Sequence, residues 1–459
     1  MKRLSMIDDA MLRAETRRQQ LHIAVLMLFK PPAGAPADFA ARLADRLRQS
    51  TQAVEPFNRH LVRKRGLHYW DTDEEFDLAH HFVHLSLPKP GRIRELLAMV
   101  SRVHGAHLDR AYPLWRIYLI EGIEDGSIAL YFKIHHAVAD GVGGIKMIMN
   151  MMSTDVEKSL TQPPPWESKL KNAHAQPLPV PTPAAGTLSA ARSLWREGLK
   201  SVGPVVRELR GAWKDFRAKN PDLVVAGQAP RCIFNAKVSA TRRFAAQSYA
   251  TPRLRAVQKA SGASLNDIVL AMCSGALRRY LQDRNELPDL PLVAAVPVSV
   301  RRDDSALGNE VAFTMAQLAT HLEDPAARLA AITSCMNYNK ERIKRLKPGE
   351  LVAYGALLLV PGAVQALLGT KPDRALGNLV ISHVPGPKET LYWQGARMTG
   401  MYPVSLVTDS GALNITVVSR HDFVDFGLIA CRKTVPHMQR LLGYLEDALA
   451  ELETAYKVK

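Results

Sequence analysis

Apolar positions recur along the chain with both strand and helix periods, which predicts a mixed α/β fold. In Ser127–Ile134 every second residue is large and apolar, and this period of two predicts a strand with one buried face. In Phe39–Gln49 apolar residues recur every four positions, with Asp38 placed as the N-cap of a helix. The same patterns predict strands at His22–Phe29, Arg116–Glu121, Leu292–Val300, Leu413–Ser419 and Phe426–Cys431, and helices at Val142–Met152, Ser264–Leu281, Pro325–Leu346 and Pro436–Leu452.

A proline-rich stretch divides the chain. Seven prolines fall within Gln162–Pro183, and because proline is excluded from the interior of regular elements this stretch predicts an exposed linker. The next segment, Leu188–Ala218, alternates apolar and basic residues around Pro204, which predicts two short amphipathic helices. Such helices can lie on a membrane or pack on a domain, and both interpretations stay open. The predicted organisation is an N-terminal domain at 1–160, a linker with basic amphipathic helices at 161–230 and a C-terminal domain at 231–459.

One segment is apolar enough to be weighed as a membrane span. Leu351–Thr370 has twenty residues without a charge, which reaches the length of a transmembrane helix. Pro361-Gly362 lies at its centre, so a kinked pair of buried helices is favoured over a span. Small residues such as Gly355 would let these helices wall a slot for an alkyl chain, although plain core packing also accounts for them.

The composition excludes a disordered chain and favours an anionic partner. Hydrophobic residues make up 47% of the 459 positions and charged residues 23%, which is enough apolar material for a packed core. Lys and Arg exceed Asp and Glu by 60 to 44, and this net charge of +16 suits nucleic acid, an anionic membrane or a polyanionic small molecule. Because no nucleic-acid-binding motif accompanies the charge, nucleic acid is not expected.

Cysteine use and the first residues predict the compartment. The four cysteines form no C-x-x-C motif and no pair at metal-ligand spacing, which is typical of a reducing compartment and speaks against a zinc fold. The start of the chain lacks the apolar core of a signal peptide. We therefore expect a cytoplasmic protein.

The segment His135–Gly141 (HHAVADG) carries the clearest chemistry. It follows directly on the predicted strand Ser127–Ile134, and adjacent strand residues point to opposite faces, so one histidine can face a cleft while the other anchors the turn. A neutral imidazole near pH 7 can act as a general base on an alcohol or thiol. No G-x-S-x-G elbow or convincing cysteine nucleophile occurs, which favours direct attack over covalent catalysis. No further ligand cluster supports a metal site on this motif.

His135–Gly141 matches HHxxxDG, the motif of the chloramphenicol acetyltransferase-like acyltransferases, which nonribosomal peptide condensation domains share. More narrowly, the chain resembles the bacterial bifunctional wax ester synthase / acyl-CoA:diacylglycerol acyltransferases. The blocks that carry this resemblance lie in order at Pro113-Leu114-Trp115, Ser261–Asp267, Pro297–Arg301, Gly308-Asn309, Ser382–Pro387, Ala412–Thr416 and Phe426–Leu428. Gly308-Asn309 lacks the Leu-Pro that often ends its block, and Ser405–Gly411 contains one inserted serine, so substrate preference stays open.

The resemblance implies two chloramphenicol acetyltransferase-like α/β domains with an active-site channel between them. It implies an O-acyltransferase that moves a long-chain acyl group from acyl-CoA to a fatty alcohol, giving a wax ester, or to diacylglycerol, giving triacylglycerol. His136 would be the general base in a direct ternary-complex attack. Asn266 would donate to the oxyanion, although a role as helix cap is an open alternative.

The resemblance also implies supporting roles around the base. His135 would hold the loop by a hydrogen bond, Asp140 would pair with an arginine, for which Arg301 is the candidate, and Gly141 would supply backbone geometry. Residues expected near the substrates are Pro113, Leu114, Trp115, Asp267, Arg301 and Gly355.

No metal or prosthetic group is implied. The expected partners are acyl-CoA, fatty alcohols and diacylglycerol, at the inner face of the cell membrane or a lipid-droplet surface, with the protein a monomer or a homodimer. Two alternatives remain: a carrier-protein-dependent acyltransferase or condensation enzyme, which shares the histidine motif, and a non-catalytic lipid-droplet-binding protein. The choice between wax ester and triacylglycerol, and the chain length, also remain open.

Overall fold

The computed structural model describes residues 1–139, 141–168, 220, 222–224, 227–299, 311–345 and 374–458. Most of the predicted linker Gln162–Pro183, the basic segment Leu188–Ala218 and the apolar segment Leu351–Thr370 lie outside these residues. Among the helices within the described ranges, none is long and apolar enough to cross a membrane.

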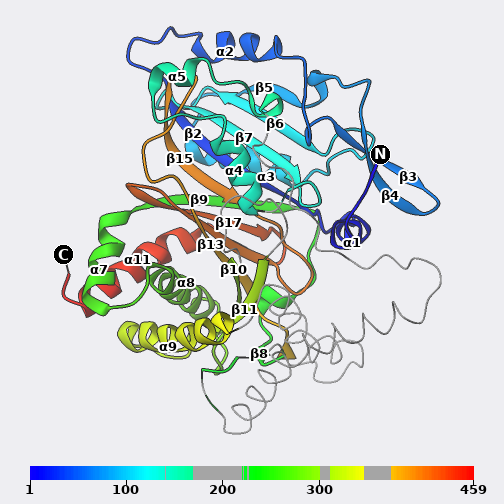
Figure 1. Cartoon of the computed structure of the whole chain (residues 1–459). Helices are drawn as coiled ribbons and strands as arrows, with labels where there is room; N and C mark the ends of the chain where they lie inside the picture. Colours follow the sequence, from blue (N-terminus) through cyan, green and yellow to red (C-terminus); the bar gives the residue numbers. More distant parts are fainter. Residues whose placement is uncertain are drawn as a thin grey trace. The chain divides into compact units, whose positions relative to one another are not determined.

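The described chain confirms the predicted mixed α/β class (Figure 1). The first six-stranded sheet has, in spatial order, β14 (Tyr392–Trp393), β15 (Ala396–Val404), β2 (His22–Lys30), β7 (Ile128–His135), β6 (Trp115–Glu121) and β5 (Phe82–Ser86). The second has β11 (Val311–Gln317), β10 (Val293–Ser299), β13 (Leu379–Pro385), β16 (Leu413–Ser419), β17 (Phe423–Cys431) and β9 (Arg242–Ala250). Smaller sheets contain β1 (Lys2–Arg3), β4 (Leu67–Thr72) and β3 (Arg59–Lys64), and β12 (Arg374–Ala375) with β8 (Ala229–Pro230).

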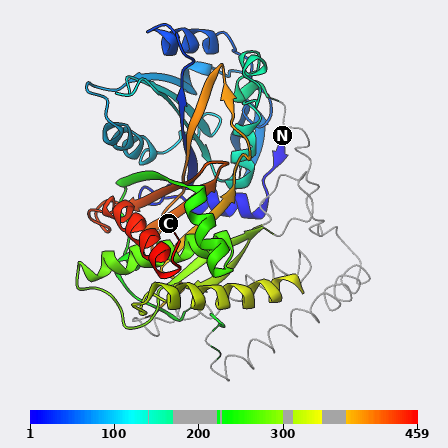
Figure 2. The same ribbon diagram turned by 90° about the vertical axis from the view of Figure 1, so that its left-hand side faces the viewer.

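The described chain has the helices α1 (Met6–Ala14), α2 (Phe39–Arg48), α3 (Ile93–His104), α4 (Gly141–Met149), α5 (Val156–Leu160), α7 (Thr251–Ser261), α8 (Leu265–Gln282), α9 (Pro325–Lys344) and α11 (Arg440–Ala455). The predicted helices α2, α4, α8 and α9 begin within one residue of the expected position, whereas α11 begins at Arg440 instead of Pro436. The helices α1, α3, α5 and α7 are not among those predicted from the sequence. Asp38 stands at the predicted start of α2, but its side chain makes no capping hydrogen bond and instead pairs with Arg42. The helices α8 and α11 lie side by side (Figure 2). Gly275 in α8 allows their close approach, because a Cβ there would lie 2.8 Å from Cβ of Ala448.

The strand β7 is buried on both faces, which corrects the prediction of a single buried face. Its even-numbered residues from Ile128 to Ile134 join an apolar cluster with residues of α2 and α4, such as Leu43 and Ile148. The opposite face lies against the end of α3, where Lys133 Nζ donates to the carbonyl of Val103 at 3.1 Å. A central strand of a sheet covered by helices on both sides has no solvent face, so the polar residues of β7 are buried with the apolar ones.

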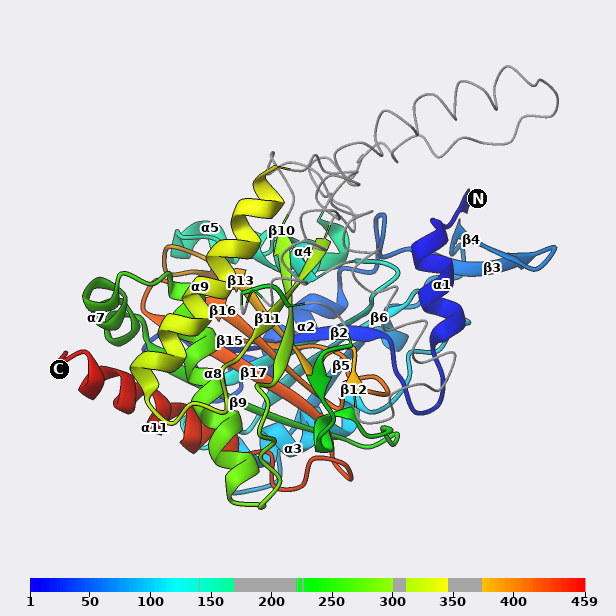
Figure 3. The same ribbon diagram turned by 90° about the horizontal axis from the view of Figure 1, so that it is seen from below.

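The described residues form two compact units that interleave along the sequence. The first comprises Met1–Lys171, Ile233–Arg255 and Ile381–Gly443, and the second Asn172–Cys232, Ala256–Val380 and Tyr444–Lys459. Two segments of the predicted C-terminal domain thus belong to the first unit, since β15 pairs antiparallel with β2 in the first sheet. Near the N-terminus, α1 lies beside β4, where His68 Nδ1 is 2.6 Å from Asp9 Oδ1 (Figure 3). Pairing between strands so distant in sequence leaves no local signal, which explains why the boundaries at 160 and 230 do not divide the units.

Candidate active site

The first motif histidine, His135, ends β7, and the second, His136, begins the tight turn that follows. The carbonyl of His135 accepts hydrogen bonds from the backbone N–H of Val138 at 2.9 Å and of Ala139 at 3.4 Å. The backbone N–H of His136 donates to the carbonyl of Leu21 at 2.9 Å, just before β2. His135 is 1% exposed, whereas His136 is only partly buried. The two side chains therefore take different positions, with His135 inside the protein and His136 near its surface.

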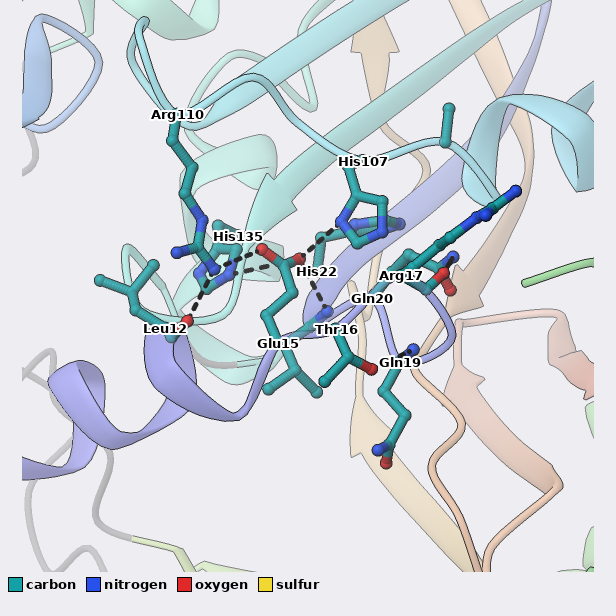
Figure 4. Close-up of polar contacts among 12 residues, drawn as sticks. Leu12, Glu15, Thr16, Arg17, Gln19, Gln20, His22, His107, Arg110 and His135 are labelled. Carbon is teal, nitrogen blue, oxygen red and sulfur yellow. Dashed lines mark hydrogen bonds and ion pairs between the residues drawn. The ribbon is translucent and has the colours of Figure 1, made fainter. Parts of the chain in front are cut away.

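One ring nitrogen of His135 accepts a hydrogen bond, and the other faces a carboxylate without a hydrogen bond. Its Nδ1 accepts a hydrogen bond from the backbone N–H of Ala137 at 3.1 Å, so Nδ1 carries no proton and Nε2 does. Nε2 lies 3.7 Å from a carboxylate oxygen of Glu15 (Figure 4). The predicted role of His135 as support for the loop thus has a direct counterpart in this hydrogen bond.

Glu15, at the end of α1, belongs to no motif, and sequence reasoning missed it. Its side chain is only 5% exposed and meets Arg110 Nη2 at 2.8 Å and His107 Nδ1 at 3.4 Å (Figure 4). Burial by itself raises the pKa of a carboxyl, but the contacts with His135 and Arg110 prevail and lower the pKa of Glu15 to about 2. The carboxylate is therefore charged throughout the neutral range.

A buried polar layer lies beside His135 on the α3 side of the first sheet. His22 pairs with His135 across the strands β2 and β7, and its Nε2 lies 2.7 Å from the carbonyl of His104. His104 Nδ1 in turn lies 2.7 Å from the hydroxyl of Tyr131. Burial lowers the pKa of His22 and of His104 well below the usual range and lowers that of Lys133 to about 7. Within the described ranges, no three His, Cys, Asp or Glu side chains form a group that could hold a metal ion.

The block Pro113-Leu114-Trp115 packs behind the turn. All three residues are buried, and Leu114 and Trp115 are each 1% exposed. The carbonyl of Leu114 accepts from the backbone N–H of His135 at 2.9 Å, and Trp115 Nε1 donates to the carbonyl of Phe57 at 2.7 Å. In the described part of the chain the block thus packs against the end of β7, and its expected place near the substrates stays a prediction.

The Asn-Asp block lies at the start of α8, where the sequence left Asn266 open between helix cap and oxyanion donor. Ser264 Oγ accepts from the backbone N–H of Asp267 at 3.3 Å, and Asp267 Oδ2 accepts from that of Ser264 at 3.0 Å, which forms a capping box. Asp267 is 1% exposed and lies 3.8 Å from Lys340 Nζ, so its side chain stabilises the helix start, and its expected contact with substrate stays a prediction. Asn266 is half-buried, and its side chain makes no hydrogen bond with the described residues. Asn266 is therefore not the cap of α8.

Several predicted residues lie outside the described part of the chain. Asp140, its candidate partner Arg301, and Gly355 are among them, as is the block Gly308-Asn309. Gly141 is described and is the first residue of α4. The expected pairing of Asp140 with Arg301 and the alkyl slot at Gly355 stay predictions. The expected channel joining His136 and Asn266 also stays a prediction, since the two residues belong to different compact units.

Comparison with solved structures identifies the fold. The chain is similar to the first condensation domain of the calcium-dependent antibiotic synthetase, with a TM-score of 0.59 over 99% of this chain and 96% of that one. At 16% identity this likeness shows the fold alone. The chloramphenicol acetyltransferase-like fold implied by the motif is thereby confirmed.

Closer relatives match along the whole chain. The chain is 41% identical to the wax ester synthase/diacylglycerol acyltransferase from Marinobacter aquaeolei VT8, with a TM-score of 0.80 and full coverage of both chains. It is 45% identical to the O-acyltransferase WSD of Acinetobacter baylyi over 99% of this chain and 97% of the relative. Residues 4–269 match the wax ester synthase/diacylglycerol acyltransferase catalytic domain and residues 307–453 the WS/DGAT C-terminal domain. The chain therefore belongs to the wax ester synthase/diacylglycerol acyltransferase family.

Proposed function

We propose that the protein transfers a long-chain fatty acyl group from acyl-CoA to the hydroxyl of a fatty alcohol or of diacylglycerol. The observation that carries this proposal is the full-length similarity to relatives named for these reactions, together with the intact HHxxxDG motif at the end of a rigid central strand. A general base that follows directly on a buried strand is already held in position, so the reaction does not have to supply the entropy of ordering it.

His136 is proposed as the base. It takes the proton of the acceptor hydroxyl while the oxygen attacks the thioester carbonyl, so that a C–O bond forms and the carbonyl oxygen becomes an oxyanion. The intermediate then collapses, the C–S bond breaks, and the departing thiolate of CoA takes the proton back from His136.

Direct attack is favoured over a covalent enzyme intermediate. Cys273 and Cys335 are fully buried, and burial raises the pKa of both thiols, that of Cys335 to about 11. A thiol with a raised pKa carries little thiolate and is a weak nucleophile. Burial alone would also raise the pKa of Cys431, but hydrogen bonds with Ser239 and Thr434 prevail and lower it to about 7. Cys431 is nevertheless fully buried and not accessible to a substrate. We keep the expectation that no metal or prosthetic group takes part.

Asn266 is proposed as the oxyanion donor. Its side chain is half-buried at the first turn of α8, where backbone N–H groups add positive potential, and Ser264 and Asp267 relieve it of capping. Replacing Asn266 with Ala should lower kcat by roughly 10²–10³-fold if the amide stabilises the oxyanion. A kcat within about twofold of the parent would leave Asn266 without this role.

The test is esterification by the purified protein. One long-chain acyl-CoA is offered with hexadecanol in one reaction and diacylglycerol in another, and both ester and released CoA are measured. His136→Ala should lose about 10²–10⁴-fold in rate. His421→Ala, at an exposed histidine that pairs with its neighbour Asp422 at 2.5 Å, is the control and should keep the parent rate.

The outcomes separate the alternatives. Ester formed by the parent and nearly lost in His136→Ala supports the proposal, and the ratio between the two acceptors ranks wax ester against triacylglycerol synthesis. A protein that ignores free acyl-CoA but accepts an acyl carrier protein would be a carrier-dependent enzyme. Binding of lipid without any release of CoA would indicate a non-catalytic droplet protein.

We further propose that the protein works peripherally on the inner face of the cell membrane and on lipid droplets. Both acyl acceptors are nearly insoluble, and the net charge of +16 favours anionic headgroups as well as CoA. Flotation with vesicles should show binding that increases with the fraction of anionic lipid and weakens at high salt. Equal binding to neutral vesicles would contradict the electrostatic part of this proposal.

A further inference from the structure

Glu15 is a buried charge placed against the turn that carries His136. Its carboxylate has three cationic or ring-nitrogen neighbours, Arg110 at 2.8 Å, His107 at 3.4 Å and His135 at 3.7 Å. Placing a carboxylate at 5% exposure is unfavourable unless such partners compensate the lost hydration. Stability alone does not require this carboxylate, since burying an ion pair is often no better than burying apolar groups.

One route from Glu15 to the turn passes through the ring of His135. The carboxylate lies on the Nε2 side of the ring and favours the tautomer with its proton there. That tautomer leaves Nδ1 free to accept the backbone N–H of Ala137 at 3.1 Å. With the proton on Nδ1 instead, two N–H groups would face each other and this hydrogen bond would be lost. Figure 4 shows the carboxylate directed at His135 from the end of α1.

A second route passes through the backbone of Leu21. The carboxylate of Glu15 accepts a hydrogen bond from the N–H of Leu21 at 3.2 Å. The carbonyl of the same residue accepts the backbone N–H of His136 at 2.9 Å. Glu15 therefore holds two residues next to the proposed base. It holds Leu21, whose carbonyl accepts the backbone N–H of His136, through the N–H of that residue, and it holds Ala137, which follows His136 in the chain, through the ring of His135.

We infer that Glu15 is a positioning residue for the acyl transfer, which fixes the tautomer of His135 and holds the turn so that His136 meets the substrate hydroxyl in the reactive geometry. This inference rests on the proposed role of His136 as the base. Glu15 itself is not the base, because its carboxylate is buried and its low pKa makes it a poor proton acceptor.

The kinetic test compares Glu15→Ala, Glu15→Gln and Asp9→Asn. Asp9 is a matched control, because it lies on the same helix and also contacts one arginine, Arg13 at 2.7 Å, and one histidine, His68 at 2.6 Å. Glu15→Ala should lower kcat by about 10–100-fold at unchanged KM for acyl-CoA, since a misplaced base costs rate rather than binding. Glu15→Gln keeps an acceptor oxygen within reach and should recover part of this loss. Asp9→Asn should keep kcat within about twofold.

The unfolding midpoint of each variant is measured beside its kinetics, and the assay runs well below the lowest midpoint. A loss of kcat that follows stability across all three variants, with Gln no better than Ala, would overturn the inference and make Glu15 a structural residue. So would a Glu15→Ala protein that is folded and has the kcat of the parent.

Nitrogen NMR of histidine-labelled protein gives a readout that does not depend on activity. In the parent the ring of His135, assigned with a His135→Gln sample, should carry its proton on Nε2 alone. In Glu15→Gln this preference should weaken, with Nδ1 protonated in part of the molecules. An unchanged His135 spectrum in a folded variant would refute the inference, whatever the kinetics. If the parent makes no ester, the proposed function fails, but the NMR result still decides whether Glu15 sets the tautomer.

Discussion

The buried amine of Lys133 should make the stability of the protein depend on pH. Lys133 lies in the middle of the active-site strand β7, is 1% exposed, and its Nζ donates to the carbonyls of Val103 and Ala106 at the end of α3. Burial, and secondarily the charge of Arg116, lowers the pKa of Lys133 from 10.5 to about 7. The folded protein therefore binds this proton more weakly than the unfolded chain does.

The direction and size of the effect follow from proton linkage. Below pH 7 the amine is charged in both states, and burial of the charge costs about 5 kcal/mol, at 1.36 kcal/mol for each pH unit between 10.5 and 7. As the pH rises from 7 to 10 the folded amine becomes neutral while the unfolded amine stays charged. The free energy of unfolding should thus increase by about 3–4 kcal/mol over this interval through Lys133 alone.

The perturbation is Lys133→Met, which keeps an unbranched side chain of similar length without the amine. It also leaves the carbonyls of Val103 and Ala106 without this donor, at a cost of about 1–3 kcal/mol each. At pH 7 that cost and the removal of the buried charge nearly cancel, whereas at pH 10 only the cost remains. Lys133→Met should therefore be close to the parent at pH 7 and about 2–4 kcal/mol less stable at pH 10.

Urea unfolding of both proteins at half-unit steps from pH 6.5 to pH 10 measures this difference. Taking the difference between the two proteins removes the contribution of the buried tyrosines and thiols, which they share. A constant difference across the whole range would refute the reasoning, because it would mean that Lys133 does not change its protonation on folding.

Three further predictions concern stability. The pKa of Glu15 is about 2 in the folded protein against 4.5 ordinarily, so the ionised carboxylate stabilises the fold above pH 4.5, and this effect is lost as the pH falls through 2. The difference in unfolding free energy between the parent and Glu15→Gln should therefore shrink by about 2 kcal/mol from pH 7 to pH 3. A constant difference would count against the ionised carboxylate. Ser264→Ala removes the N-cap of α8 and should cost about 1 kcal/mol in urea unfolding, while a change below a few tenths would show that the cap is dispensable. Gly427→Ala would place a Cβ 1.9 Å from the carbonyl oxygen of Pro403 and should lower the free energy of unfolding by about 1–3 kcal/mol. Gly443→Ala, where the new Cβ would meet no atom within 4 Å, should be neutral or stabilising. Equal unfolding midpoints for the two variants would contradict the packing argument.

Elements with a strong local signal are predicted almost to the residue. The spacing of apolar residues predicts β7 and α8, and Ser264 is the N-cap that the sequence indicates. Asp38 marks the start of α2 correctly, but its side chain turns to Arg42. Helix periods and caps depend on residues within one turn of each other, so a single segment contains the information that fixes them.

The site likewise has features that the sequence predicts and features that only the structure shows. The HHxxxDG motif and its spacing predict the base and indicate the reaction class, whereas the structure shows that Asp267 forms a capping box with Ser264. The sequence by itself thus determined the family, the central strands β2, β6 and β7 and the helices α2, α8 and α9, and it predicts the role of His136. Tertiary structure alone decided that β15 joins the first sheet, that the polar face of β7 is buried, and that Glu15 meets His135. These features depend on contacts between segments far apart in the chain, and a contact of this kind leaves no period, cap or spacing in the local sequence that could reveal it.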